Sequence, residues 1–393
     1  MALLDRKIRL GVIANEFFDR SIGRVGGFGW AARQVSRVFS ENPDLGVEVV
    51  FFCAERINNQ DYGIVETGPH RVYVCSGWSK WLYARHVARH ERIDVFLTID
   101  YRPSYDLWLL AFPRVPVIIW SRDPRTKSDA RRILSLRIPG KEGIVPDGIR
   151  SPDTTRLYYQ WNMSRLVGRP MLIATKMDHL AEKIRDAYGV SSNASIRLPN
   201  PLDLCSSTNS GTKDRQPTVL FLGRLDPCKR PWLFVDLARL FPQYQFLVLG
   251  QSHFPGSRGW EVKDIPENMR FFGHIDGAAK YEQLTSAWVL VNTSIHEESP
   301  VSVFEALACE TPVLSCTDWG NIVSRFGIVA GGNQGVGMDA IPALAKGLQR
   351  LMEDNELRIT LGRRGREWVC KEHGDRKFID CFRRACFDLG VGA

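Results

Sequence analysis

Residues 296–307 read HEESPVSVFEAL and place Glu297 and Glu305 eight positions apart, on either side of a Ser-Pro pair. Ser299 is a favourable N-cap residue, and Pro300 fits the first helical position, where a missing amide hydrogen costs nothing. A helix is therefore predicted to begin at this pair. The two glutamates then flank the start of that helix, one in the preceding loop and one on the helix itself.

The start of this helix, which is predicted to run through Cys309, is a candidate anion site. The amides of Val301 and Ser302 would have no acceptor within the helix, and the positive end of the helix dipole favours a phosphate there. Glu305 lies about 7–8 Å further along the helix axis, at roughly 1.5 Å per residue. This separation suits a diphosphate with hydroxyls on both sides, which is the shape of a nucleotide-sugar. The alternative is a capped amphipathic helix with two solvated glutamates.

A second segment, residues 219–231, reads VLFLGRLDPCKRP and predicts a buried strand that runs into a polar turn. Its first four residues are a continuous apolar run, as expected in a parallel sheet, and Gly223 ends it. Arg224 and Lys229 then follow the carboxyl end of the strand, where open α/β sheets bind their ligands. Two fixed cations there would stabilise a diphosphate leaving group. The alternative is that both side chains are merely solvated.

Taken together, the two segments resemble the retaining, nucleotide-sugar-dependent glycosyltransferases of family 4, which have the two-domain GT-B architecture. Four motifs match in the order that this family has them. They are the glycine loop at Gly26 and Gly27, the sequence PNPLD at residues 199–203, Gly223 and Arg224 with Lys229, and Glu297 with Glu305.

The resemblance implies roles for individual residues. Glu297 would contact the transferred sugar and Glu305 the ribose, while Arg224 and Lys229 would hold the diphosphate; Arg224, Lys229 and Glu297 are the candidate catalytic residues. No cofactor beyond a UDP- or GDP-linked sugar is expected, and no metal. The candidate donor-binding residues are Gly26, Gly27, Arg224, Lys229, Gly273, His274, Ile275, Ser299, Val301, Ser302 and Glu305.

Three positions depart from the family pattern. Arg122, followed by Asp123, stands where the family often has a histidine. An arginine cannot act as a base at neutral pH. Both residues are therefore assigned to the acceptor side, where Arg122 would bind a phosphate or an anionic sugar. Glu298 replaces a usual glycine and is expected to point into solvent, with recognition of a sugar hydroxyl as the alternative. Gly320 and Asn321 replace a glutamate-containing loop, so the donor stays open.

The expected fold is α/β, with two Rossmann-like doubly wound domains facing each other across a deep cleft, as in GT-B enzymes. A chain of 393 residues suits two such domains. Residues 1–203 are predicted to bind the acceptor, residues 204–375 the donor, and residues 376–393 to form a helix that crosses back. Apolar runs predict strands at residues 8–14, 47–53, 95–99, 117–120, 219–222, 245–250, 269–272, 289–292 and 313–315.

Positive charge is concentrated in the first half of the chain. Residues 1–200 hold 30 lysines and arginines against 21 acidic residues, whereas residues 201–393 hold 22 against 23. Tryptophans interleave with basic residues at 78–92, which suits an anionic membrane surface or a lipid-linked, saccharide or other anionic acceptor. The alternatives are a solvated basic helix or nucleic-acid binding, but the latter leaves the acidic pair and the glycine loop unexplained.

The remaining composition restricts the chemistry. Nine cysteines without a C-x-x-C pair and eight histidines without H-E-x-x-H spacing indicate no zinc site. There is no run of eighteen apolar residues and no signal-peptide core, so we expect a cytoplasmic protein, peripheral at the inner face of the membrane. The alternatives within the same fold are a nucleotide-sugar epimerase, a phosphorylase and a catalytically silent nucleotide-binding protein.

Overall fold

The computed structural model of the chain describes residues 7–16, 27–67, 70–141, 143–146, 155–190, 195–204, 213–252, 256, 258–332 and 334–392. The chain folds into two compact units, and neither is continuous in sequence. Unit 1 consists of Met1–Pro124, Asp153–Leu202 and Asp375–Ala393, and unit 2 of Arg125–Pro152 and Asp203–Gly374.

Unit 1 is built on an eight-stranded sheet with the strand order β3-β4-β2-β1-β5-β6-β7-β8. Neighbouring strands are parallel except at one edge, where β3 pairs antiparallel with β4. The strands are β1 Ile8–Ile13, β2 Val47–Cys53, β3 Tyr62–Thr67, β4 His70–Cys75, β5 Val95–Ile99, β6 Val117–Ser121, β7 Met171–Thr175 and β8 Ser195–Arg197. The four strands predicted from apolar runs in this half of the chain are all present.

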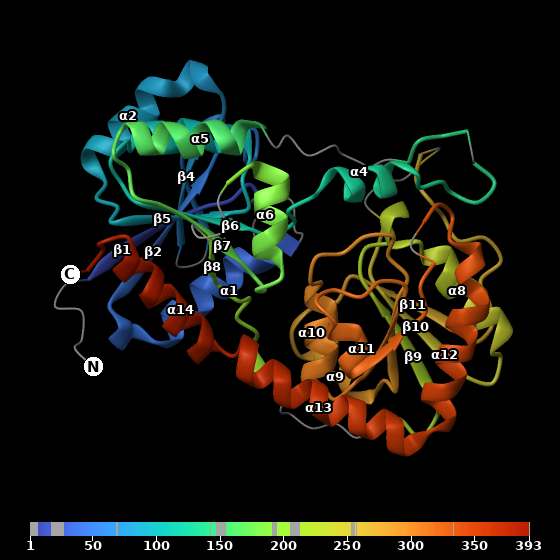
Figure 1. Ribbon diagram of the computed structural model, residues 1–393. Coiled ribbons are helices and arrows are strands. Elements are labelled where there is room, and N and C mark those ends of the chain that lie inside the picture. The colour runs from blue at the N-terminus through green and yellow to red at the C-terminus, as the bar shows by residue number, and fades with distance from the viewer. Residues whose placement is uncertain are drawn as a thin grey trace. The chain divides into compact units, whose positions relative to one another are not determined.

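Helices cover both faces of the unit 1 sheet, because each face is apolar and needs its own layer. Helices α1 and α14 pack on one face around a core that includes Val35, Phe378 and Phe382, and α2, α3, α5 and α6 cover the other (Figure 1). The helices are α1 Gly27–Glu41, α2 Trp81–His90, α3 Asp106–Ala111, α5 Thr155–Leu166, α6 Leu180–Tyr188 and α14 Asp375–Asp388, with short 3-10 turns η2 Pro43–Leu45, η3 Trp78–Lys80 and η4 Pro103–Tyr105.

Unit 2 is a second doubly wound sheet, with the order β11-β10-β9-β12-β13-β14 and parallel neighbours throughout. Its central strand β9 has β10 on one side and β12 on the other. The strands are β9 Thr218–Leu222, β10 Gln245–Leu249, β11 Met269–Gly273, β12 Val289–Asn292, β13 Val313–Ser315 and β14 Gly327–Val329. All five strands predicted for this half are confirmed, and the α/β fold class with two doubly wound sheets is confirmed with them.

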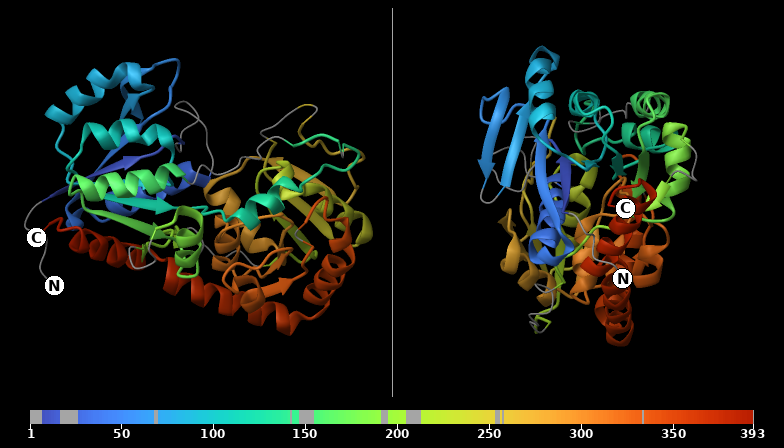
Figure 2. Two further views of the ribbon diagram at one scale, coloured as in Figure 1. Left: turned by 45° about the horizontal axis from the view of Figure 1, so that its top comes forward. Right: turned by 90° about the vertical axis from the view of Figure 1, so that its left-hand side faces the viewer.

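The helices of unit 2 also lie on both faces of its sheet. Helices α8 and α12 pack on one face around Phe234, Leu344 and Leu348, and α9, α10 and α11 lie on the other (Figures 1 and 2). The helices are α4 Lys127–Leu134, α8 Pro231–Leu240, α9 Gly277–Ser286, α10 Val301–Ala308, α11 Ile322–Phe326, α12 Ile341–Glu353 and α13 Asn355–His373, with 3-10 turns η6 Pro227–Lys229 and η7 Met338–Ala340.

The segment after β6 differs from the predicted domain boundary. Residues 125–152 were expected in the N-terminal domain, but they belong to unit 2. Leu136 and Ile138 are 0% and 1% exposed because they enter the apolar core of unit 2. The Lys141 ammonium donates to Gly259 O at 2.9 Å. Burial of this apolar pair, rather than proximity in sequence, decides where the segment lies.

Candidate active site

Most of the predicted donor-binding residues follow the carboxyl ends of three strands of unit 2. The loop after β9 carries Arg224 and Lys229, and the loop after β12 carries Glu297. Backbone contacts hold the two loops together: Ile295 N donates to Cys228 O at 3.0 Å, and Thr293 Oγ1 donates to Lys229 O at 2.6 Å. Because β9 and β12 are parallel neighbours, their ends meet at one edge of the sheet, which is where such folds bind ligands.

Lys229 and Glu297 form a partly buried ion pair. The Lys229 ammonium bonds Glu297 Oε1, and Ser294 Oγ donates to the same oxygen at 2.7 Å. The two side chains are 20% and 11% exposed. Within the described residues Oε2 of Glu297 has no hydrogen bond, so one carboxylate oxygen is fixed and the other is available to a ligand.

The electrostatics of Glu297 are decided by this partner. Burial alone raises the pKa of the carboxyl, but the charge and hydrogen bond of Lys229, with the Ser294 hydroxyl, outweigh it and hold the pKa below the ordinary value. Glu297 is therefore an anion at neutral pH. A group of this kind accepts hydrogen bonds and does not supply a proton.

Arg224 is the second cation that is predicted to hold the diphosphate. Its Nη1 lies 3.1 Å from Asp226 Oδ2, and its side chain is 48% exposed while that of Asp226 is 1% exposed. One nitrogen of the guanidinium is thus paired with the buried carboxylate of Asp226, and the rest of the group is exposed to solvent. Sequence reasoning missed the residue that holds this loop in place, Arg230. Its buried guanidinium donates to Thr293 O at 2.8 Å and to Gly332 O at 2.7 Å.

Helix α10 begins one residue later than predicted, and Ser299 is not its cap. Pro300 occupies the N-cap position with φ −67° and ψ 132°, and no side chain caps the helix. Ser299 instead has φ +75°, in the left-handed region, whereas a capping serine adopts an extended backbone. The amides of Val301 and Ser302 are still the first two of the helix, so the predicted anion site at its N-terminus remains geometrically possible.

Glu305 lies on the buried face of α10 and is 4% exposed. Its Oε1 accepts a hydrogen bond from the Lys280 ammonium at 2.8 Å, and Lys280 also lies 3.1 Å from Asp276 Oδ1. Burial raises the pKa of Glu305, and Lys280 acts in the opposite direction. The sequence analysis did not identify Lys280. The signal was available, because Lys280 stands four residues before the buried Leu284 and therefore on the same face of α9.

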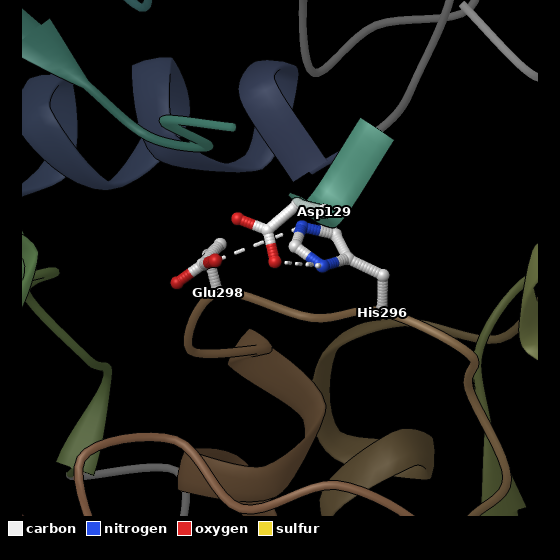
Figure 3. A group of neighbouring side chains, drawn as sticks. All are labelled: Asp129, His296 and Glu298. Carbon is white, nitrogen blue, oxygen red and sulfur yellow. Dashed lines mark ion pairs between the residues drawn. The ribbon is translucent and has the colours of Figure 1, made fainter. Parts of the chain in front are cut away.

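Glu298 does not point into solvent, and the expectation for it is wrong. It is 6% exposed and faces the ring of His296, with Nε2 at 3.7 Å from Glu298 Oε1. Asp129 of α4 faces the other ring nitrogen, with Nδ1 at 3.6 Å from its Oδ1 (Figure 3). The residues 125–152 thus bring a carboxylate next to the loop that carries Glu297, which sequence proximity could not indicate.

These three side chains are the candidate metal ligands in the described part of the chain, since their ligand atoms lie within 4.8 Å of one another. Two features oppose a shared ion. Each carboxylate faces a different ring nitrogen of His296, although Figure 3 shows both carboxylates on the same side of the ring. In addition, Arg132 Nη2 lies 3.4 Å from His296 Nδ1 and pairs with Asp129. A cation there would compete with the arginine. The arrangement fits two carboxylates shared between a histidine and an arginine better than a metal centre.

The predicted base-binding residues lie at the end of β11. Gly273 has φ +69°, which favours glycine, and its carbonyl already accepts a hydrogen bond from Gly250 N at 2.7 Å. His274 is exposed and Ile275 is half-buried. The backbone of His274 and Ile275 therefore remains the candidate for contact with a base, and the carbonyl of Gly273 is engaged within the sheet.

The predicted residues of unit 1 are placed less favourably for ligand binding. Arg122 is 3% exposed, stacks over the Trp120 ring at 4.6 Å, and donates from Nη1 to Asn200 Oδ1 at 2.7 Å. Burial lowers its pKa to about 10. As the structure stands, its guanidinium joins β6 to the PNPLD segment. Asp123 is half-buried, Gly27 is the first residue of α1, and Gly26 lies outside the described residues.

The comparisons with known proteins concern the part of the chain that carries these residues. Residues 206–368 match the family model described as "Glycosyl transferases group 1", so this part of unit 2 is a glycosyltransferase group 1 domain. A phosphatidyl-myo-inositol mannosyltransferase of Mycolicibacterium smegmatis is 29% identical over 187 residues, which are 44% of this chain and 47% of that protein. The corresponding protein of Mycobacterium leprae is 30% identical over 260 residues, 62% of each chain. The chain therefore matches about half to three-fifths of the length of these relatives.

Solved structures show the fold. A sucrose-phosphate synthase from Thermosynechococcus elongatus superposes with a TM-score of 0.70 at 17% identity, covering 98% of this chain and 100% of that one. An Anabaena protein solved in complex with UDP and glucose superposes with a TM-score of 0.65 at 12% identity, covering 97% and 99%. The chain thus has the GT-B type of fold, with two Rossmann-like α/β domains.

Proposed function

Starting from the glycosyltransferase group 1 domain at residues 206–368, we propose that the chain is a retaining glycosyltransferase. It moves a hexose-type sugar from a UDP- or GDP-linked donor to an acceptor hydroxyl. The observation that carries the proposal is the partly buried Lys229–Glu297 pair at the carboxyl ends of β9 and β12, next to the N-terminus of α10. The curated relatives named as mannosyltransferases and the structure solved with UDP and glucose support it.

In the proposed chemistry, positive groups lie where negative charge develops on the leaving group. Arg224 and Lys229, with the amides of Val301 and Ser302, stabilise the negative charge that grows on the diphosphate as the sugar departs. Glu297 keeps one oxygen on Lys229 and offers the other to sugar hydroxyls. Because Lys229 lowers the pKa of Glu297, this carboxylate is a weak base, and the buried Arg122 cannot act as one; the leaving diphosphate itself accepts the proton of the acceptor hydroxyl.

The first test is a panel of nucleotide-sugars and free nucleoside diphosphates, measured by thermal shift and by release of sugar, with and without EDTA. Stabilisation by one nucleotide series with slow release of its sugar supports the transferase and identifies the donor. Conversion of the donor sugar without an acceptor indicates an epimerase, and a requirement for inorganic phosphate indicates a phosphorylase. Binding without turnover indicates a silent binding protein. No response to any nucleotide rejects the proposal.

Lys229→Ala directly tests whether Lys229 holds the diphosphate. We expect turnover to fall by about 100- to 1000-fold, as for loss of one charge-stabilising donor. Lys346→Ala on α12 is the matched control, because Lys346 is an exposed lysine of the same unit with no predicted role. Equal activity of the two variants would remove Lys229 from the mechanism.

On the acceptor side we propose a lipid-linked or other anionic glycan acceptor, met at a membrane surface. Trp78 and Leu82 are 54% and 83% exposed, and the neighbouring Arg89 is also exposed. Aromatic and basic side chains in this arrangement suit the interface of an anionic bilayer. In the described part of the chain, no helix has both the length and the apolar character needed to cross a bilayer.

Membrane contact is tested by flotation with phosphatidylcholine vesicles, with and without phosphatidylglycerol. The chain should float only with the anionic vesicles, and a Trp78→Ser/Leu82→Ser variant should not. Leu240→Ser, at a 53% exposed leucine of unit 2, controls for loss of any exposed apolar side chain. Flotation of the double variant equal to that of the unmodified chain would contradict the proposed surface.

A further inference from the structure

Helix α9 buries a lysine. Lys280 is 6% exposed and lies on the face of α9 that also buries Tyr281 and Leu284. A lysine is almost never found fully buried without a partner, because removing an ammonium from water costs several kcal/mol. The partners of Lys280 are Glu305 Oε1 at 2.8 Å and Asp276 Oδ1 at 3.1 Å. The positive charge of Lys280 therefore lies beside the carboxylate of Glu305 on α10.

The contact fixes one half of the Glu305 carboxylate. Glu305 is 4% exposed, and it lies between Phe304 and Ala306, both of which are 0% exposed. Its Oε1 is occupied by Lys280, while Oε2 makes no hydrogen bond within the described residues. The carboxylate is therefore held in one orientation and keeps a single acceptor atom for an external group.

The ion pair also controls charge. Burial lowers the pKa of Lys280, but the carboxylates of Glu305 and Asp276 outweigh this and raise the pKa above its ordinary value. Lys280 is thus a fixed cation at neutral pH. An isolated carboxylate at Glu305 would repel a nearby diphosphate; beside Lys280, which also pairs with Asp276, its charge is partly compensated, and it still accepts hydrogen bonds.

Glu297 has the same arrangement eight residues earlier. A lysine from another segment, Lys229, bonds its Oε1 and leaves Oε2 without a hydrogen bond within the described residues. Each glutamate of the pair thus has its own lysine. Lys229 comes from the loop after β9 and Lys280 from α9, so the two acceptors are fixed independently.

We propose that Lys280 is a positioning residue that orients Glu305 toward the ribose hydroxyls of the donor, and so sets the preference for a ribonucleoside diphosphate over its 2′-deoxy counterpart. This rests on the proposed function, because the ribose is that of its donor. Lys280 itself does not touch the nucleotide. A hydrogen bond from a hydroxyl to a fixed carboxylate is worth a factor of about 10–100 in affinity, and that factor depends on the orientation of Oε2.

The test compares binding of UDP with 2′-deoxy-UDP, and of GDP with 2′-deoxy-GDP, by calorimetry. The unmodified chain should prefer the ribonucleotide of its own base by about 10- to 100-fold. In Lys280→Met the ratio should fall to within about 3-fold, chiefly through weaker binding of the ribonucleotide, while Lys280→Arg should restore most of it. A ratio in Lys280→Met equal to that of the unmodified chain overturns the inference.

Two controls separate positioning from general damage. Lys213→Met removes another lysine of unit 2 that bonds the end of α10, through Cys309 O at 3.2 Å and Thr311 Oγ1 at 2.6 Å; it should lower stability and leave the ratio unchanged. In a Glu305→Gln background, Lys280→Met should change the ratio no further, since it acts only through Glu305. A further loss would overturn the inference.

The remaining outcomes are also decisive. Should Lys280→Met fail to fold, Lys280→Gln, whose polar end is one bond shorter, carries the same comparison, and its ratio must fall. If the unmodified chain binds ribo- and deoxyribonucleotide equally, the inference fails while the proposed function stands. If it binds no nucleoside diphosphate at all, both fail.

Discussion

Removal of Lys229 should destabilise unit 2, because it leaves the mostly buried anion of Glu297 without its cation. We consider Lys229→Met, which keeps the apolar stem. Breaking a buried ion pair from one side costs about 3–5 kcal/mol; since Lys229 is 20% exposed and Ser294 Oγ still donates to Glu297, the lower end applies. For a unit of about 200 residues, about 3 kcal/mol corresponds to a fall of about 6–12 °C in Tm.

The pH dependence of this loss follows from Glu297. Its pKa is below the ordinary value of 4.5 because of Lys229, so the pair contributes stability that is present above pH 4.5 and lost as the pH falls through the lower, folded-state pKa. In Lys229→Met burial raises the pKa of Glu297 and is opposed only by the Ser294 hydrogen bond and His296, so Glu297 takes up a proton more readily than in the unmodified chain. The difference in Tm between the two proteins should therefore narrow between pH 7 and pH 5.

The assay is thermal unfolding of the unmodified chain, both single variants and the double variant Lys229→Met/Glu297→Gln. Glu297→Gln alone should cost only about 1 kcal/mol, because the remaining ammonium is partly hydrated. The double variant should recover about 2 kcal/mol of the loss, since no buried charge is left. A double variant as unstable as Lys229→Met would refute the reasoning, and so would a loss that is independent of pH.

Three further predictions concern stability. Gly250→Ala should lower the free energy of unfolding by at least about 3 kcal/mol in chemical denaturation, because the new Cβ would lie 1.8 Å from Gly223 O at φ +154°. Gly331→Ala, at φ +79° with open space around it, should lower it by only about 1 kcal/mol. Equal losses would contradict the packing argument. Glu310→Gly should stabilise by about 0.5–1 kcal/mol, because Glu310 follows the C-cap of α10 with φ +55°; a lower Tm would show that its ion pair with Arg366 outweighs the strain. Burial lowers the pKa of His70 below 6.5, so the unfolded state binds a proton more readily than the folded state, and stability should fall as the pH drops below 6.5. His70→Gln should therefore make Tm less dependent on pH between pH 7.5 and 5.5. An unchanged dependence of Tm on pH would assign the effect to another group.

The sheets were predictable to the extent that their strands are buried. Continuous apolar runs identified β1, β2, β5 and β6 of unit 1 and β9 to β13 of unit 2. Three of the strands missed, β3, β8 and β14, lie at the edges of their sheets. An edge strand needs less apolar sequence than a central one, and β8 and β14 have only three residues each. Their pairing is decided by the neighbouring strand, which a single stretch of sequence does not contain.

The positions of the candidate site residues in the fold were predictable, and their contacts were less so. The motif brought Arg224, Lys229 and Glu297 to one edge of the sheet, as expected from parallel strands. The backbone at Ser299 could not be predicted, because its left-handed φ is imposed by the loop and contradicts the preference of serine for capping. The helical pattern of α9 indicated that Lys280 is buried, but its contact with Glu305, like that of Asp129 with His296, joins segments distant in sequence and is shown only by the structure.

The discontinuity of unit 1 has a consequence for how the chain folds during synthesis. Phe378, Phe382 and Cys386 of α14 complete the core on one face of the unit 1 sheet, and Arg37 of α1 bonds Asp375 at 2.6 Å. The ribosome makes all of unit 2 before these residues appear. The first unit therefore waits with this apolar sheet face covered by α1 but not by α14, while the second can already fold, so the usual order of N-terminal domain first is reversed. A protease pulse on stalled nascent chains should cut unit 1 until α14 has emerged.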